Sequence, residues 1–242
     1  MKAMKTRFTK SRMGFLLAAG MLVLSPWACR TSKDTSASPA GFAEKKGIVS
    51  VEAEHYDTQI QQEVRAWYNT SLYMAPFFEP DPDPAHAEGA SNGAYLELLP
   101  DSRVTHDDKL IHGENFSNQA GQMAILSYRV YFRKTGKYYV WVRAYSTGSE
   151  DNGLHVGIDG TWPESGQRMQ WCEGKHQWTW ESKQRTQENH CGEPEKIFLE
   201  VREPGWHDIR FSMREDGFEF DKWVMSLKYE KPEGMGPPET KR

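Results

Sequence analysis

The sequence has few long apolar stretches, and this limits how the chain can meet a membrane. No stretch outside residues 13–24 comes near the length and apolar character of a membrane helix. The run at 13–24 has 12 residues, too few to span a bilayer comfortably, and it follows a basic start without acidic residues. A short apolar core behind basic residues is typical of a secretory signal peptide. We therefore expect residues 1–28 to be a signal peptide and the chain to be exported.

Positive charge is scarce once the signal peptide is set aside. The full sequence has 30 Lys and Arg residues against 34 Asp and Glu, a formal charge of −4. Five basic residues belong to the expected signal peptide, which leaves 25 against 34 and a formal charge near −9. Proteins that bind nucleic acids need a basic surface to neutralise phosphates. We therefore expect no nucleic-acid partner.

Cysteine is also scarce, with three residues in the chain. Cys29 follows the apolar run and the small residue Ala28, which resembles a bacterial lipoprotein cleavage site with Cys29 as the lipidated residue. Pro26 and Trp27 depart from the usual residues of such a site, so ordinary secretion with cleavage near Ala28 is the alternative. Residues 29–46 are rich in Thr, Ser, Lys, Ala and Pro and predict a flexible tether.

Cys172 and Cys191 remain when Cys29 carries lipid. An exported chain would pair them, so we predict a disulfide, with two buried free thiols as the alternative. Closing this loop would stabilise the fold by roughly 3 kcal/mol. A zinc site lacks support, because neither a second cysteine pair nor a histidine at ligand spacing accompanies them.

Familiar catalytic motifs are missing as well. The sequence has no His-Glu-x-x-His motif and no glycine-rich phosphate loop. Residues 89–93 fit the Gly-x-Ser-x-Gly pattern of a nucleophile elbow, but that chemistry needs a strand before the serine and a helix after it. Here a proline-rich stretch precedes Ser91 and an extended segment follows. We therefore expect no enzyme; a glycoside hydrolase or lyase is the alternative, because acidic residues are abundant enough to supply a carboxylate pair.

The sequence is rich in period-two alternation of apolar and polar residues, which predicts β-strands. The pattern recurs at residues 126–133, 138–145, 154–158, 197–213 and 220–229. Many strands with short turns predict an all-β fold, a jelly-roll β-sandwich of two antiparallel sheets. Apolar residues at helical spacing predict one short helix at residues 57–68. The sandwich should occupy residues 47–230, ahead of a Pro- and Gly-rich flexible tail at 231–242.

Glu52 and Glu54 form an acidic pair at the start of the expected sandwich. Residues two apart on an extended segment point to the same side, so their carboxylates can share one cation. A second acidic element, residues 216–222, lies near the far end of the domain. The first and last strands of a sandwich can lie side by side, which would bring the two elements together. The alternative is a pair of solvent-facing glutamates on an edge strand.

Eight short motifs follow one another between residues 48 and 229. They are Glu-Ala-Glu at 52–54, Gly-Ala-Tyr-Leu at 93–96, Tyr-Arg-Val at 128–130, Gly-Lys-Tyr-Tyr-Val-Trp-Val-Arg at 136–143, Val-Gly-Ile-Asp-Gly at 156–160, Trp-Thr-Trp at 178–180, Gly-Trp-His at 205–207 and Phe-Asp-Lys-Trp at 220–223. In this order they resemble the galactose-binding-like jelly rolls of carbohydrate-binding module families 6 and 35. They are also similar to the carboxy-terminal module of glycoside hydrolase family 115.

The resemblance implies a structural calcium between the first and last strands, with Glu52, Glu54 and Asp221 as its acidic ligands. Backbone carbonyls would complete the shell, as suits Ca²⁺, which takes six to eight oxygen ligands.

The resemblance also implies a sugar site in loops at one end of the sandwich. Tyr95 and Trp178 would flank the sugar, and Asp216 and Glu219 of the last loop would add hydrogen bonds. This loop departs from the families' pattern, which often has Asn there. Trp171, beside the predicted disulfide, is a further candidate, and core packing is the alternative for each tryptophan.

We therefore expect an exported, lipid-anchored β-sandwich of the cell envelope that binds a polysaccharide or oligosaccharide without catalysis. It would meet the membrane only through its lipid anchor and would hold glycan for separate carbohydrate-active enzymes. Arg185 and Lys183 can contact an acidic sugar through charge-assisted hydrogen bonds, or can be solvated charges on a strand. A structural or adhesion module without a glycan site is the remaining alternative.

Overall fold

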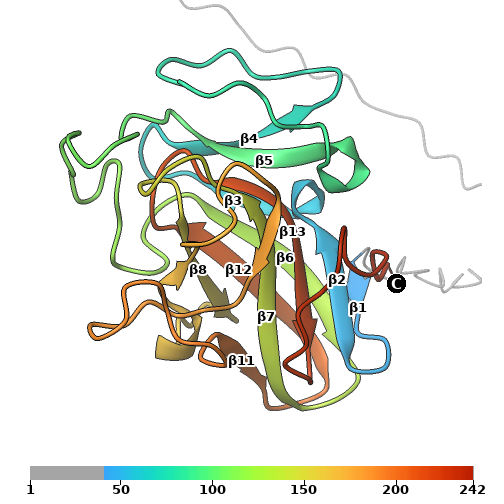
Figure 1. Ribbon diagram of the computed structural model, residues 1–242. Coiled ribbons are helices and arrows are strands. Elements are labelled where there is room, and N and C mark those ends of the chain that lie inside the picture. The colour runs from blue at the N-terminus through green and yellow to red at the C-terminus, as the bar shows by residue number, and fades with distance from the viewer. Residues whose placement is uncertain (1–40, 242) are drawn as a thin grey trace, which may run out of the picture. The chain divides into compact units, whose positions relative to one another are not determined.

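The computed structural model describes residues 41–241. The expected signal peptide, Cys29 and most of the expected tether lie outside this range. Within it the chain forms two β-sheets that share one hydrophobic core (Figure 1). The helical elements of the described range are three short 3₁₀ turns: η1 Ala53–His55, η2 Ser91–Gly93 and η3 Glu164–Gly166. No helix there is long and apolar enough to cross a membrane.

The first sheet has six strands in the order β1-β6-β12-β8-β9, and β3 also pairs with β6. Its strands are β1 Phe42–Ala43, β3 Thr58–Ile60, β6 Ile125–Phe132, β8 Gly153–Ile158, β9 Met169–Gln170 and β12 Gly205–Met213. Every pair is antiparallel except β1 with β6.

The second sheet has seven strands in the order β10-β7-β13-β5-β4, all antiparallel, with β11 on β7 and β2 on β13. Its strands are β2 Ile48–Glu52, β4 Ala66–Ser71, β5 Ala94–Leu99, β7 Gly136–Tyr145, β10 Thr179–Glu181, β11 Phe198–Val201 and β13 Glu219–Ser226. The last strand, β13, pairs along its length with β7 and on its other edge with β5 and then β2. An early strand and the last strand therefore lie side by side, as predicted.

The alternating residues of both sheets supply the core. Phe211 of β12 packs against Phe220 of β13 with ring centroids 4.9 Å apart, and Tyr128 of β6 meets Trp223 of β13 at 5.2 Å. These contacts join the inner faces of the two sheets, as in a sandwich. The predicted all-β jelly-roll β-sandwich is confirmed, apart from its helix.

The helix expected at residues 57–68 is wrong. The segment forms β3, a bend, and the start of β4. Ile60 and Val64, which would have faced the core from a helix, are exposed, whereas Trp67 enters the core from β4. Pairing with β5 satisfies the backbone of β4, and the Trp67 indole donates to the Ala124 carbonyl at 2.7 Å. Tertiary pairing has overridden a local pattern of period 3.6.

Both predicted domain limits also need correction. Phe42 of β1 is buried in the core, so the sandwich begins inside the expected tether. The tail, expected to be flexible, is bound to the sandwich through its described residues: the carbonyl of Thr240 accepts from the Ala43 amide at 2.9 Å, and its hydroxyl accepts from the Ser50 amide at 3.0 Å. The Trp180 indole donates to the Gly234 carbonyl at 2.9 Å. Composition alone gave no sign of these long-range bonds.

Candidate functional site

The structure buries most of the residues predicted to bind sugar. Tyr95, Trp171, Asp216 and Glu219 are each at most 2% exposed. Trp171 belongs to the core, with its ring 5.0 Å from that of Phe218, so its prediction as a sugar platform is wrong. Its indole donates to the carbonyl of Thr179 on β10 at 3.3 Å, so the polar atom of the ring is satisfied within the fold.

Tyr95 and Glu219 lie on the outer face of the second sheet, beneath the segment of residues 79–91. His86 of that segment contacts Glu219 through Nδ1 and Oε1 at 2.6 Å, and its ring stacks on Tyr145 at 3.8 Å. The segment's backbone amide at His86 donates to the Tyr95 hydroxyl at 3.2 Å. The covering segment therefore keeps both predicted residues from a ligand at the surface.

Trp178 is the partly exposed member of the predicted set. Its ring packs edge-on against Tyr95 at 5.2 Å and Tyr145 at 5.5 Å, and its indole donates to the His86 carbonyl at 3.1 Å. Trp180, two residues later on the same face, is buried against Trp141. The structure thus leaves Trp178 as the aromatic of this motif that can reach a ligand.

Asp216 has a structural partner instead of a ligand. Its Oδ2 accepts from Arg65 Nε and Nη2 at 3.0 and 2.9 Å, and from the amide and hydroxyl of Ser102 at 2.9 and 2.8 Å. Burial nevertheless raises the pKa of Asp216, against these hydrogen bonds. The carboxylate anchors the last loop to the segment before β4.

The residues predicted to bind calcium meet at the η2 turn. Ser91 donates its amide to Asp221 Oδ1 at 2.6 Å and its hydroxyl to Glu52 Oε1 at 3.0 Å. Two cations of the chain also reach this site: Lys222 Nζ lies 2.7 Å from Glu52 Oε1, and Arg143 Nη1 lies 2.6 Å from Asp221 Oδ2. Both oxygens of Asp221 are therefore occupied.

Two glutamate oxygens at the same turn remain without partners. Oε2 of Glu52 and Oε2 of Glu54 are buried and make no hydrogen bond. Burial raises the pKa of Glu54 to about 7, which marks a carboxylate poorly compensated by its surroundings. No three acidic, histidine or cysteine side chains of the described range form a metal-binding group. At this turn the unpaired acceptors are thus the two glutamate oxygens, whereas Asp221, the third predicted ligand, is engaged by Ser91 and Arg143.

A hollow of about 580 Å³ opens beside the predicted disulfide loop. We call it the basic pocket, because its lining includes three arginines, Arg168, Arg185 and Arg214, beside the imidazoles of His112 and His190. Phe116, Asn118, Glu164, Thr186 and Gln187 complete the wall. The sequence singled out Arg185 as a contact for an acidic sugar. The lining comes from the loops before β6, before β9 and after β10, and Arg214 directly follows β12.

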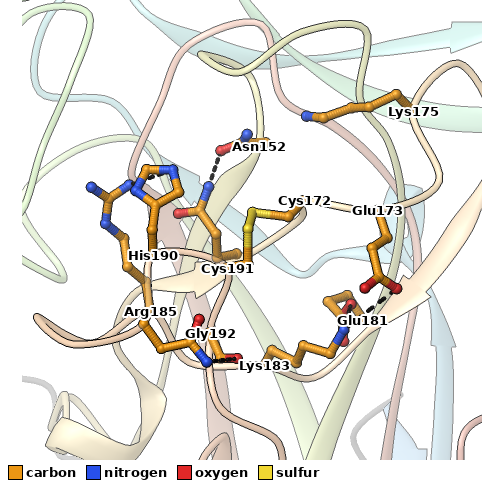
Figure 2. Close-up of a disulfide and its surroundings, with 12 residues drawn as sticks. Asn152, Cys172, Glu173, Lys175, Glu181, Lys183, Arg185, His190, Cys191 and Gly192 are labelled. Atoms are coloured by element: carbon orange, nitrogen blue, oxygen red, sulfur yellow. Dashed lines mark hydrogen bonds and ion pairs between the residues drawn. A yellow bond between two sulfur atoms is a disulfide. The ribbon is translucent and has the colours of Figure 1, made fainter.

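The loop that carries Arg185 and His190 is tightly closed. Gln184 and Glu193 exchange backbone hydrogen bonds at 3.0 and 2.8 Å, and the Cys172–Cys191 disulfide ties the loop to the segment after β9. The predicted disulfide is thus confirmed, with Cα atoms 5.3 Å apart. Figure 2 shows the Arg185 guanidinium beside the His190 ring on one side of this bond. The loop presents both side chains from a fixed backbone.

The arginines of the basic pocket differ in how their charge is compensated. Arg168 pairs with Glu164 and Arg214 pairs with Glu215. Arg185 has no carboxylate within ion-pair distance among residues 41–241; its guanidinium reaches His190 Nε2 at 3.5 Å. Burial, and then the charge of Arg214, lower the pKa of Arg185. Positive charge therefore exceeds negative charge in the lining.

Lys183, the other cation singled out in the sequence, lies differently. Its Nζ is 3.2 Å from Glu181 and 3.7 Å from Glu173 (Figure 2). Two carboxylates thus neutralise the lysine, whereas Arg185 faces the pocket with its charge available.

Comparison with known proteins identifies the family. Residues 83–239 match the model of the glycosyl hydrolase family 115 C-terminal domain, so the chain belongs to that family, as the motifs predicted. A protein of Formosa agariphila named Uncharacterized protein P23 is 57% identical over 185 residues, covering 76% of this chain and 45% of that protein. The chain therefore spans less than half the length of this relative.

Solved structures similar to this chain include two carbohydrate-binding modules. The family 35 module from Clostridium thermocellum is 16% identical, with 73% of this chain and 97% of that chain covered and a TM-score of 0.40. The C-terminal family 6 module of the marine laminarinase LamC from Zobellia galactanivorans is 12% identical, with 74% and 98% covered and a TM-score of 0.39.

Proposed function

We propose that this protein binds carbohydrate without catalysis, and that the basic pocket is where the glycan is held. The observation that carries the proposal is the pocket itself, a loop-borne hollow of about 580 Å³. Its volume lies within the roughly 300–1,000 Å³ of small-molecule sites. Arginine, histidine, asparagine and glutamine side chains in its wall donate hydrogen bonds, which sugar hydroxyls accept. Membership of the family 115 C-terminal domain family supports a role beside carbohydrate-active enzymes.

Affinity electrophoresis of the protein in gels that contain soluble polysaccharides, one polysaccharide to a gel, tests this function. Arg185→Ala should abolish the retardation that the wild-type domain shows in at least one gel. Arg202→Ala is the matched control, since Arg202 is exposed and lines a different hollow. Trp178→Ala is the competing variant: if it alone removed binding, the aromatic cluster over the second sheet would be the site. A folded wild type that is retarded by no glycan would favour a structural or adhesion module.

The absence of catalysis is proposed on the pocket's composition. Its one acidic side chain, Glu164, is paired with Arg168, so the lining offers no second carboxylate for glycosidic chemistry. Incubation of the mature protein with each bound polysaccharide should release neither reducing ends nor unsaturated uronides. Turnover that scales with protein and disappears in Arg185→Ala would overturn this.

Calcium binding at the η2 turn is the second proposal. Glu52 and Glu54 would supply their free oxygens, and the ion would add stability by pinning β2 to the turn ahead of β5. Chelation should lower Tm, added calcium should restore it, and Glu54→Gln should remove the response. Glu200→Gln, an exposed control on β11, should keep it. A Tm unchanged by chelation would dismiss the site.

Export and lipid anchoring remain proposals from the sequence, since Cys29 lies outside the described residues. Metabolic labelling with a radioactive fatty acid should mark the wild-type chain and leave Cys29→Ala unlabelled. If Cys29→Ala stayed in the membrane fraction, another form of attachment would be needed. An anchored chain could hold polysaccharide at the envelope for separate degrading enzymes.

A further inference from the structure

We infer that the basic pocket selects an anionic substituent on the glycan, a carboxylate or a sulfate ester, and holds it against the guanidinium of Arg185. This inference rests on the proposed function and adds the chemical class of its ligand.

The first argument is charge. Of the three arginines in the wall, Arg168 and Arg214 each have a carboxylate of their own, and Arg185 has none within the described residues. Its close neighbour His190 cannot compensate it, because a protonated ring would add a second positive charge. A half-buried guanidinium without a counter-ion is costly, and an anion entering the pocket relieves that cost.

The second argument is the mutual repulsion of the cations. Both Arg185 and Arg214 lower the pKa of His190, after the effect of burial. Arg214 in turn lowers the pKa of Arg185. These groups therefore lie within one another's electrostatic reach. Glu164 and Glu215 pair with Arg168 and Arg214, which leaves Arg185 as the arginine of the lining whose charge is not paired.

The third argument is geometry. Arg185 and Arg168 come from separate segments that are held together: the Arg185 amide donates to the Arg168 carbonyl at 2.8 Å, and Arg168 Nε donates to the Arg185 carbonyl at 3.2 Å. Arg214 forms the buried end of the wall, with its guanidinium 5.0 Å from the centre of the Phe116 ring. Planar guanidinium groups match the oxygens of carboxylates and sulfates, often through two parallel hydrogen bonds.

The disulfide strengthens this argument. A loop closed by Cys172–Cys191 and by the Gln184–Glu193 bonds loses little entropy on binding, so more of the charge-assisted contact appears as affinity. A surface lysine such as Lys183 lacks this arrangement, since it is already neutralised by Glu181.

Isothermal titration with chemically matched polymers tests the inference. The pairs are polygalacturonate against its carboxyl-reduced form, and dextran sulfate against dextran, at a fixed salt concentration. We expect the charged member of at least one pair to bind roughly tenfold or more tightly, the scale of one charged hydrogen bond. The pair that shows the difference distinguishes carboxylate from sulfate.

Arg185→Gln removes the charge and keeps a polar side chain that still donates hydrogen bonds, although it is shorter and has fewer donors. It should abolish most of the difference between charged and neutral members, whereas the control Arg202→Gln should preserve it. Thermal melting of each variant confirms that it folds. Equal affinity for charged and neutral polymers would refute the inference but leave carbohydrate binding intact. Binding of every polyanion with no loss in Arg185→Gln would also refute it, by showing general charge attraction. Failure to bind any polymer would instead remove the proposed function.

Discussion

Substitution of Glu97 by glutamine should make the fold more stable at alkaline pH. Glu97 of β5 lies directly opposite Glu219 of β13 in the second sheet. Like charges at such cross-strand positions repel, and both residues are buried beneath the covering segment. The pair therefore favours a state in which at least one carboxyl keeps its proton.

The magnitude follows from the pKa of Glu97. Burial, and then the nearby Asp81, raise it from 4.5 to about 7, although Thr70 and Tyr95 donate hydrogen bonds that lower it. A folded-state pKa above the unfolded value means that the folded protein binds more protons between these values. The free energy of unfolding should therefore fall as pH rises from about 4.5 to about 7. At 1.36 kcal/mol for each pH unit, the loss amounts to at most about 3 kcal/mol.

Urea unfolding followed by tryptophan fluorescence at pH 5 and pH 8, in the presence of a chelator, measures this effect. The wild type should lose stability between the two values, and Glu97→Gln should lose less, by about 2–3 kcal/mol. The exposed control Glu200→Gln should follow the wild type. Burial, and then the charge of Glu97, raise the pKa of Glu219, so the double variant should gain less stability than the sum of the gains of Glu97→Gln and Glu219→Gln. Identical pH slopes in the wild type and Glu97→Gln would refute the reasoning.

Three further predictions follow from the packing. Replacing Cys172 and Cys191 together by serine should lower the free energy of unfolding by about 3 kcal/mol and weaken glycan binding, as measured by urea titration and calorimetry. An unchanged stability and an unchanged affinity would show that the disulfide is not needed to hold this loop. Removing residues 231–242 should lower Tm by a few degrees, because it removes hydrogen-bond partners of β2 and of the Trp180 indole. A truncated protein that melts at the same temperature as the full-length protein would contradict this prediction. Asp216→Ala should cost about 3 kcal/mol, because it deprives buried Arg65 of its main partner, and a double-mutant cycle with Arg65→Met should show strong coupling.

The sequence predicted features that depend on neighbouring residues and missed features that depend on contacts between distant parts of the chain. The alternation in β6 and β7 predicted the core faces, because a strand shows its period of two in its own residues. The disulfide was predicted because two cysteines remain once Cys29 is set aside and because an exported chain would pair them. The segment at 57–68 failed because Trp67 is held by β5, some 30 residues away in the chain.

The sugar-site residues failed for a related reason. The family pattern placed Tyr95 beside a sugar, but it gave no account of the segment at 79–91 that covers this residue. Whether an aromatic residue is exposed depends on loops that differ from one family member to another. The sequence did not predict the basic pocket either, because its three arginines are distant from one another in the chain. Of these arginines, the sequence singled out Arg185.

The segment of residues 214–219 contributes both to the buried cluster beneath residues 79–91 and to the basic pocket. The resemblance placed a hydrogen-bonding residue for the sugar at Asp216 or Glu219, and the structure commits both carboxylates to partners inside the protein. Arg214, just before them in the chain, is then the residue that reaches a hollow. Glu215 holds it there and accepts the Asn152 amide at 3.0 Å. Where the families' pattern often has Asn, this segment brings Arg214, paired with Glu215, to the wall of the pocket and turns the carboxylates of Asp216 and Glu219 inward. The segment therefore adds no unpaired negative charge to the proposed site, which is why an anionic ligand is the one we expect there.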